Sequence, residues 1–327
     1  MPTRQSGYHK GVLNWLLIGV GDIAVRRVIP AIEAEPRSRL YGVVSRNPAK
    51  GLLYGVQHSW ATLDEALQDP AIDAVYVATP VFLHAPQSVA ALRAGKHVLC
   101  EKPMALNYAE ASAMVEAGRQ SGRQFGIAYY RRGYPKLHRA RQLIADGAIG
   151  RPVLAEINCH DWFTAEDGQR AWLLDPAKAG GGPLYDTASH RIDVLNFLFG
   201  KPLAVAAQLS NAVHQTAVED NATLLIEYGN GVRGIVDVRR HSRVPRDQFR
   251  IVGTDGEIEL SPLNGEAIVY PGGREELPCH ANLHYPAIEN FAGAVTEGEP
   301  LMATGESSLW AEWVIEQARL APRAALQ

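Results

Sequence analysis

Residues 15–24 read WLLIGVGDIA, an apolar run that ends in a glycine turn and passes directly into an amphipathic stretch. Gly19 and Gly21 occupy the first two small positions of a GxGxxA pattern, and Ala24 occupies the third. In a strand–turn–helix unit the first glycine permits the tight turn, and the second lets backbone approach a pyrophosphate at the helix N-terminus. A purely structural strand-to-helix turn can match the same pattern, so the surrounding sequence has to decide.

The surrounding sequence alternates short apolar runs with longer amphipathic ones from residue 14 to about residue 128. The apolar runs are WLLIGV, RLYGVVS, AVYVATP and HVLCEKP, and the amphipathic ones include AVRRVIPAIEA and APQSVAALRAG. Strands separated by helices at this spacing are typical of βαβ units in a parallel sheet with both faces covered. We predict an α/β fold in which residues 1–130 form a doubly wound Rossmann domain that binds a dinucleotide.

The pattern changes after about residue 130. Runs such as RPVLAEINCHDW and QFRIVGTDGEIEL alternate with period two, and Asn230-Gly231 and Asp255-Gly256 are hairpin signals. We predict that residues 131–327 form an α+β domain for substrate binding and oligomerisation, with a large, mostly antiparallel open sheet. A last amphipathic helix, about residues 305–320, is expected to pack back on the body.

Composition limits the classes of partner. The 327 residues carry a net charge of −3, which provides no basic footprint for nucleic acid or an anionic membrane. The first apolar run is too short for a signal peptide or a membrane span. Cys100, Cys159 and Cys279 form no CxxC pair and cannot all pair with one another, which suits a reducing compartment. We expect a cytoplasmic protein that binds neither nucleic acid nor membrane.

The end of the second predicted strand bears on the cofactor. An Asp or Glu usually meets a free ribose 2′-hydroxyl about 20 residues after the glycine turn, but this strand ends in Ser45-Arg46. A hydroxyl and a guanidinium suit a 2′-phosphate. We therefore expect NADP(H) to be favoured over NAD(H), the alternative being that Arg46 is a solvated surface residue.

The stretch AGGGPLYDTASHRID, residues 179–193, carries candidate catalytic groups. Gly180–Gly182 would let backbone approach a ligand closely, and a helix is expected to begin at about Pro183 or Leu184. Asp186 and His190 are four residues apart and would share one face of that helix. A histidine beside a carboxylate suits a general base for alcohol oxidation, or an acid for ketone reduction, which needs a fixed orientation and a pKa near neutrality. The alternative is a partly buried histidine with a surface aspartate.

A second candidate lies in VLCEKPMA, residues 98–105. Lys102 follows a predicted core strand directly and precedes Pro103, which disfavours helical backbone at the lysine. The ammonium is therefore expected to be held at the strand end. If a histidine and a reacting oxygen lay beside it, such a cation could stabilise a developing alkoxide and lower the pKa of the imidazole.

Taken together, IGVGDIA, VVSRN, VYVATPVFLHAPQSVAALRAGKHVLCEKPMA and GGGPLYDTASHRID resemble the Gfo/Idh/MocA family of glucose-fructose oxidoreductase and inositol dehydrogenase relatives. The resemblance covers nearly the whole chain and is most specific in Glu-Lys-Pro. It implies that Lys102 lies between the nicotinamide ribose and the substrate, with Asp186 and His190 on the substrate side and His190 as the proton donor or acceptor. Where many relatives carry glycine between this aspartate and histidine, the chain has Ala188.

The predicted site residues fall into three sets. The catalytic residues are expected to be Lys102, Asp186 and His190. We expect the cofactor to contact Gly19, Gly21, Asp22, Ile23, Ala24, Ser45, Arg46, Thr79, Pro80, His84, Glu101 and Lys102. The loop HDWFTAEDGQRAWLLDPAK supplies aromatic and polar groups suited to a sugar or cyclic polyol, among them Arg170 and Lys178. The predicted substrate-binding residues are Tyr130, His160, Trp162, Trp172, Asp186 and His190.

The sequence thus predicts an NADP(H)-dependent oxidoreductase that transfers a hydride between nicotinamide and a secondary alcohol or ketone of a sugar, polyol or related cyclic substrate. We expect a homodimer or homotetramer formed through the C-terminal sheet. Two alternatives stay open: a non-catalytic NAD(P)-binding sensor and, from the resemblance, an NAD-dependent redox-elimination glycosidase of the same fold. No metal is expected, because Cys279, His280 and His284 lack the intervening Glu and the further Cys/His pair of zinc sites. At the domain junction, Arg131 or Arg132 faces either the cleft or the solvent.

Overall fold

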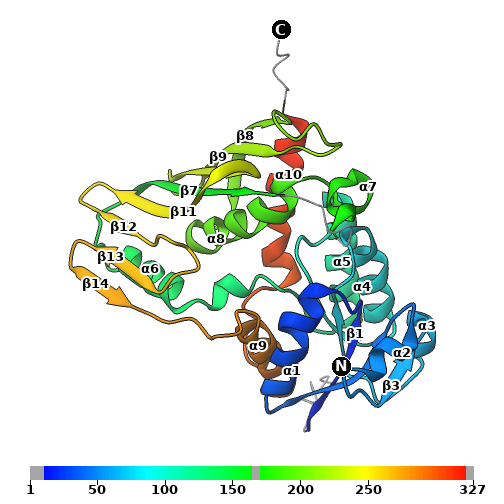
Figure 1. Cartoon of the computed structure of the whole chain (residues 1–327). Coiled ribbons are helices and arrows are strands. Elements are labelled where there is room, and N and C mark those ends of the chain that lie inside the picture. The colour runs from blue at the N-terminus through cyan, green and yellow to red at the C-terminus, as the bar shows by residue number, and fades with distance from the viewer. Residues whose placement is uncertain (1–10, 164–169, 322–327) are drawn as a thin grey trace.

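The computed structural model describes residues 11–163 and 170–321, which are organised around two sheets (Figure 1). The first sheet has six strands in the order β3-β2-β1-β4-β5-β6, and every neighbouring pair is parallel. Its strand order reverses between β1 and β4, which is where open α/β sheets bind ligands beyond the carboxyl ends of their strands. The strands are β1 (Leu13–Ile18), β2 (Ser38–Val44), β3 (His58–Trp60), β4 (Ala74–Val77), β5 (His97–Cys100) and β6 (Phe125–Ile127).

Helical segments connect these strands and cover the sheet. The predicted alternation of strands and helices is confirmed, and the fold class with it. The three-residue strands β3 and β6 lie outside the predicted pattern, because runs so short carry no periodic signal. The helical segments of this half are η1 (Ala24–Val28), α1 (Ile29–Ala34), α2 (Pro48–Leu52), α3 (Leu63–Leu67), η2 (Val81–Leu83), α4 (His84–Arg93) and α5 (Tyr108–Ser121).

The second sheet has eight strands in the order β14-β13-β12-β11-β7-β10-β9-β8. β7 and β10 are parallel, and the other neighbouring pairs are antiparallel. Both predicted hairpins form, one between β9 and β10 and one between β11 and β12. The strands are β7 (Pro152–Trp162), β8 (Pro202–Ser210), β9 (Asn221–Tyr228), β10 (Arg233–Arg239), β11 (His241–Gly253), β12 (Glu257–Glu259), β13 (Ala267–Tyr270) and β14 (Gly273–Glu276).

One face of the second sheet is the inner face, which packs on helix α8 (Figure 1). The Nη2 of Arg191 on α8 donates to the Sγ of Cys159 on β7 at 3.0 Å. Because successive side chains of a strand point to opposite faces, odd-numbered residues of β7 face inward and even-numbered residues face outward. The remaining helical segments are η3 (Tyr130–Gly133), α6 (Pro135–Ala145), η4 (Ala171–Leu174), α7 (Pro176–Ala179), η5 (Leu184–Ala188), α8 (Ser189–Phe199), α9 (Tyr285–Thr296) and α10 (Gly305–Leu320).

Two helices from the end of the chain return to the first sheet. In Figure 1, α9 lies beside α1, and α10 runs between the two halves of the molecule. Phe291 of α9 packs on Trp15 of β1 with 5.2 Å between ring centroids. The predicted helix over residues 305–320 is confirmed. The domain division at residue 130 stays a prediction, and it leaves out that α9 belongs to the hydrophobic core around β1. Within the described residues, no helix has the length and apolar character needed to cross a membrane.

Helix α10 also reaches the turn that follows β5. Glu312 is 2% exposed, and it accepts a hydrogen bond from the backbone N–H of Met104 at 2.7 Å. Burial raises the pKa of Glu312 to about 8. The folded protein therefore holds a proton at Glu312 over a pH range in which the unfolded chain has lost it.

We expect Glu312→Gln to make the protein more stable in alkaline solution. A carboxyl whose pKa is raised on folding stabilises fully below its unfolded pKa of about 4.5, and that contribution is lost as the pH rises to about 8. Glutamine keeps an acceptor for Met104 and stays neutral. Its melting temperature should match that of the unsubstituted protein near pH 5 and exceed it by several degrees near pH 9. Glu33→Gln is the matched control, because Glu33 is exposed on α1. An equal effect of Glu312→Gln at both pH values would contradict the protonation of Glu312.

Candidate active site

The glycine turn lies between β1 and the helix that begins at Ala24. Gly19 has a φ of +87°, and a Cβ there would come within 2.9 Å of the carbonyl oxygen of Ala78, so the chain itself requires this glycine. A Cβ on Gly21 would meet no atom within 4 Å. The fold therefore leaves open space at Gly21, where a bound dinucleotide would pass. The residues present fit a pyrophosphate at this turn.

The helix after the turn opens with the π-helical segment η1. The N–H of Ile29 donates to Ala24, one residue further back than in an α-helix, and Pro30 follows within the first turn of α1. Asp22 and Arg26 form an exposed ion pair at 2.7 Å. Ile23 is partly exposed at the same end of the helix.

The residues after β2 meet the requirements of a 2′-phosphate. Ser45 is half-buried, and its Oγ accepts a hydrogen bond from the N–H of Asn47 at 3.3 Å. Arg46 is exposed, and within the described part of the chain it has no carboxylate partner. An unpaired guanidinium beside a hydroxyl is available to an anionic group. The observation fits the expected preference for NADP(H) and leaves that preference a prediction.

His84 joins the two turns at the carboxyl ends of β4 and β5. It is 1% exposed, and its ring nitrogens lie 2.8 Å from the carbonyl oxygen of Thr79 and 2.9 Å from that of Pro103. Thr79 donates through its Oγ1 to Gln87 at 2.7 Å, and Pro80 precedes η2. Because both ring nitrogens face carbonyls of the chain, His84 helps to fix these turns, and its contact with a cofactor stays a prediction.

Glu101 is buried at the end of β5. Its Oε1 accepts a hydrogen bond from the Tyr76 hydroxyl at 2.7 Å and lies 3.3 Å from Nε2 of His284. Burial pushes the pKa of Glu101 upward, but His284 and Lys102 outweigh burial and hold the pKa below its usual value. Glu101 therefore stays ionised and anchors the turn from which Lys102 extends.

Lys102 is fixed by contacts from the other half of the molecule. Its Nζ donates to Oδ1 of Asp186 at 2.7 Å and to the backbone oxygen of Asp186 at 3.1 Å. Arg240, between β10 and β11, binds Oδ2 of the same carboxylate through Nη2. Burial raises the pKa of Asp186, but the two cations outweigh it and hold the pKa far below its usual value. Asp186 is a permanent anion held between two cations.

His190 lies one helical turn beyond Asp186, and its surroundings differ from those predicted. It is 6% exposed, and its Nδ1 is buried without a hydrogen-bond partner. Burial, followed by the nearby Arg131 and Lys102, puts the pKa of His190 well below its usual value. The expected pKa near neutrality is therefore wrong. Asp186 does not offset this effect, because Lys102 and Arg240 already occupy its carboxylate.

The glycines before η5 accommodate the chain's own atoms. A Cβ on Gly180 or Gly181 would come within 2.3 or 2.7 Å of the Tyr185 ring, and one on Gly182 would come within 2.0 Å of the Glu219 carbonyl oxygen. We expected these glycines to admit a ligand to the backbone, but internal packing already requires them. The helix does begin at Leu184, as predicted, with the π-helical segment η5.

The orientation of β7 shows where two predicted substrate residues lie, and their contacts with substrate stay predictions. His160 faces outward and binds Asp237 at 2.7 Å, on the side of the sheet away from α8. Trp162 packs on His214 with 4.9 Å between ring centroids. Asp161, which was not predicted, alternates onto the opposite face of β7 and is exposed at the strand end. Partial burial raises its pKa, Arg240 lowers it and Asp186 raises it. Period-two alternation from the apolar Ile157 could have identified Asp161.

The other predicted substrate residues divide between the site and its surroundings. Trp172 lines a small cavity together with Lys102 and Asp186. Tyr130 packs against His190 with 5.1 Å between ring centroids. Arg170 is exposed over the Phe163 ring, and Lys178 is exposed with Asp175 as its partner.

Both arginines at the domain junction are buried, so neither faces solvent. Arg132 pairs with the buried Asp193 and also donates to Ser307, which ties η3 to α8 and α10. Arg131 lies over the Tyr130 ring at 4.9 Å and donates to Asn264 at 3.1 Å. Arg131 therefore adds positive charge beside His190.

The His280/His284 pair is split between two environments. His280 is exposed and stacks on Tyr285, whereas His284 is buried against Tyr130 and Glu101. Across residues 11–163 and 170–321, no group of three or more His, Cys, Asp or Glu side chains could hold a metal ion.

Comparison with known proteins gives consistent matches. Residues 13–129 match the oxidoreductase family with an NAD-binding Rossmann fold, and residues 137–259 match the GFO/IDH/MocA C-terminal domain. The chain is 32% identical over 311 residues to 1,5-anhydro-D-fructose reductase of Ensifer adhaerens, covering 91% of this chain and 92% of the relative. It is 28% identical over 307 residues to D-xylose 1-dehydrogenase (NADP(+)) 2 of Haloferax volcanii, covering 90% and 92%. The crystal structure of aldose-aldose oxidoreductase from Caulobacter crescentus superposes with a TM-score of 0.84 at 28% identity, covering 94% and 98%.

Proposed function

Because the chain belongs to the Gfo/Idh/MocA family of oxidoreductases with an NAD-binding Rossmann fold, we propose that it is an NADP(H)-dependent sugar oxidoreductase. Its substrate would be a secondary alcohol or ketone of a sugar, polyol or related cyclic compound. The supporting observation is the contact of Lys102 with Asp186 at 2.7 Å, which brings together the turn after β5 and the helix that carries His190. The sugar-directed activities named for the two relatives and the Caulobacter protein support the same substrate class.

The cofactor would be held by the first sheet. Gly21 leaves space for the pyrophosphate, and Ser45 and Arg46 would bind the 2′-phosphate. When bound, the nicotinamide supplies or accepts the hydride. Glu101 and His84 keep the turns after β4 and β5 in place, so that Lys102 stays at the carboxyl end of the sheet.

Side chains of the protein would stabilise the charge on the reacting oxygen and transfer its proton. Lys102 Nζ donates to the reacting oxygen and stabilises negative charge that develops there. Asp186 orients Lys102, and Arg240 orients Asp186. His190, neutral because its pKa is lowered, accepts the hydroxyl proton in the oxidation and returns it in the reduction.

A panel of sugars, polyols and ketosugars tests the proposal by following the absorbance of reduced nicotinamide. We expect turnover with at least one member of the panel. Binding of NADPH without turnover on any of them would favour the non-catalytic sensor instead. Cleavage of a glycoside with no net change in nicotinamide would favour the redox-elimination glycosidase.

We expect NADPH to bind more tightly than NADH, and Arg46→Ala to remove most of that difference. A charge-assisted contact with phosphate is worth about 1.5–3 kcal/mol, which corresponds to about a tenfold to hundredfold loss of NADPH affinity. Titration of both cofactors against the intact protein and the variant measures it. Arg119→Ala is the matched control, because Arg119 is exposed on α5 and pairs with Glu116. Equal affinities in the unsubstituted protein would rule out the preference.

Self-association through the second sheet is also proposed. The face away from α8 exposes Leu225, 43% accessible on β9, and Ile235 on β10 faces the same way. Apolar residues on an uncovered sheet face support the predicted dimer or tetramer. A cytoplasmic location also remains a prediction.

A further inference from the structure

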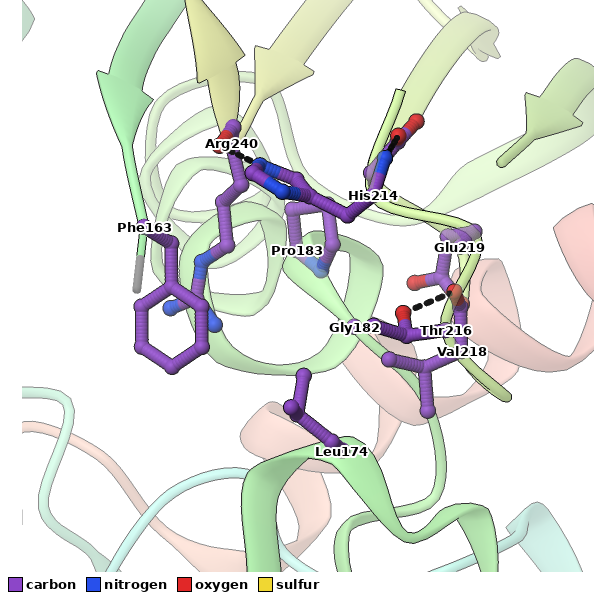
Figure 2. A pocket seen from close by; sticks show the side chains of 10 residues that line it. Phe163, Leu174, Gly182, Pro183, His214, Thr216, Val218, Glu219 and Arg240 are labelled. Atoms are coloured by element: carbon purple, nitrogen blue, oxygen red, sulfur yellow. Dashed lines mark hydrogen bonds between the residues drawn. The ribbon is translucent and has the colours of Figure 1, made fainter. Parts of the chain in front are cut away.

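A larger cavity lies beside the candidate active site (Figure 2). Its volume is about 330 Å³, within the range typical of small-molecule sites. Its walls come from the end of β7, the end of η4, the turn before η5, the loop between β8 and β9, and the junction of β10 and β11. The lining residues are Phe163, Leu174, Gly182, Pro183, His214, Thr216, Val218, Glu219, Asp220 and Arg240.

This cavity adjoins the reacting centre along two segments of the chain. Leu173 and Gly181 line the small cavity that contains Lys102 and Asp186, and the next residues, Leu174 and Gly182, line the large one. Arg240 connects the two cavities directly, because it lines the large one and binds the carboxylate of Asp186. A molecule that reacts at Lys102 could therefore extend into the large cavity.

The charges around the large cavity disfavour an anion. Arg240 is paired with Asp186, whose single negative charge it shares with Lys102. Glu219 and Asp220 add two carboxyl groups; burial raises the pKa of Glu219, and hydrogen bonds from three backbone N–H groups help hold the pKa of Asp220 at about 2. Among the described residues that line the cavity, Arg240 is the only Lys or Arg, and Asp186 already binds its Nη2. A phosphate or carboxylate placed here would have to compete with Asp186 for Arg240, and it would lie beside ionised Asp220.

The same walls combine apolar surface with hydrogen-bonding groups. Leu174 and Val218 face the cavity in Figure 2, with the ring of Pro183 behind them. Arg240 has a buried Nε without a partner, a donor that still lacks an acceptor. The Nε2 of His214 donates to the carbonyl oxygen of Arg240 at 2.9 Å, which leaves the other ring nitrogen for a further hydrogen bond. A sugar ring offers apolar C–H faces and hydroxyls to such a site.

We propose that the large cavity is a subsite for a second, uncharged sugar ring. The substrate class is then a neutral glycoside or disaccharide rather than a free monosaccharide or a nucleotide-linked sugar. The proposal rests on the proposed function, because the first ring is the one oxidised or reduced beside Lys102.

Steady-state kinetics with matched substrates test the proposal. Glucose, maltose, cellobiose, lactose and UDP-glucose are compared with NADP⁺ by the absorbance of reduced nicotinamide. We expect the best neutral disaccharide to exceed glucose by about tenfold or more in kcat/KM, a ratio that corresponds to burial of part of one ring. UDP-glucose should be no better than glucose. A ranking with glucose or UDP-glucose first would overturn the proposal.

A variant that fills the cavity separates this subsite from the reacting centre. Leu174→Trp should lower kcat/KM for the best disaccharide by about tenfold or more and leave that for glucose within about twofold. Leu320→Trp is the matched control, because Leu320 is 70% exposed at the end of α10. Thr216→Phe blocks the same cavity from the opposite loop, in case the first variant does not fold. Equal losses on both substrates, or no loss on either in a folded variant, would overturn the proposal.

Binding without turnover distinguishes the two proposals. Saturation-transfer NMR with maltose, cellobiose and lactose in the presence of NADPH detects occupancy whether or not the sugar reacts. Disaccharide signals that disappear in Leu174→Trp support the subsite even if no sugar is turned over, in which case the oxidoreductase proposal fails alone. Turnover of glucose with no saturation-transfer signal from any disaccharide would overturn the proposed subsite, while the proposed oxidoreductase activity would stand.

Discussion

Lys102→Met is expected to lower kcat by about two to four orders of magnitude, the loss typical of removing electrostatic or proton-transfer assistance. Methionine keeps much of the length of the side chain and removes the ammonium that faces Asp186 at 2.7 Å. NADPH affinity should fall much less than kcat, because the glycine turn and Arg46 are unchanged. Pre-steady-state and steady-state kinetics with the best substrate of the panel measure both quantities.

Two further variants show whether the loss of kcat in Lys102→Met comes from the chemical step or from a loss of stability. Lys178→Met makes the same substitution at an exposed lysine on α7 and should stay within about twofold. Asp186→Asn should lose less than Lys102→Met, since Lys102 keeps its ammonium but loses the charge that orients it. A Lys102→Met protein that melts at a lower temperature, yet turns over normally in its folded fraction, would assign Lys102 to stability alone.

His190→Asn should lower kcat by about two to four orders of magnitude as well, with cofactor affinity little changed. The double variant Lys102→Met/His190→Asn should be little worse than the poorer single variant, because groups that serve one transition state are not additive. His138→Asn is the matched control, since His138 is exposed and packs on Phe197. If the double variant lost kcat by the full product of the two single losses, Lys102 and His190 would not be acting on the same transition state.

The pH profile of the unsubstituted enzyme follows from the lowered pKa of His190. The neutral imidazole is the base, and it is present above its pKa, so kcat/KM for oxidation should stay level as the pH falls through about 6.5, the ordinary value. The stability of the folded protein, in contrast to kcat/KM, does change over this pH range. Below about 6.5 the unfolded chain takes up a proton at this residue and the folded protein does not, so stability falls with pH until the lowered pKa is reached.

The sequence predicted those parts of the candidate site that depend on local pattern. The glycine turn and the Glu-Lys-Pro element can each be recognised from a few consecutive residues, because each comes directly after a predicted strand. The spacing of Asp186 and His190 correctly placed both in helical backbone, on the consecutive segments η5 and α8. It did not predict their electrostatics, because the partners of Asp186 come from other elements.

The rest depends on packing between distant segments. Arg240 reaches Asp186 through the arrangement of β10 and β11 against η5, and nothing in the neighbouring residues distinguishes it from the adjacent Arg239, which pairs with Asp237. The face of β7 on which His160 lies is set by the alternation that buries Ile157, and the residue type alone does not indicate it. Long-range contacts of this kind leave no periodic signal in one sequence.

The packing of α9 on β1 has a consequence for how the chain matures. Trp15 of β1 is covered by Phe291, which follows it by 276 residues in the chain. The last strand of the first sheet ends at Ile127, so the whole sheet is synthesised well before the helix that covers one side of its core. Domains generally fold as they emerge, but the first sheet reaches its final core only after α9 has been synthesised.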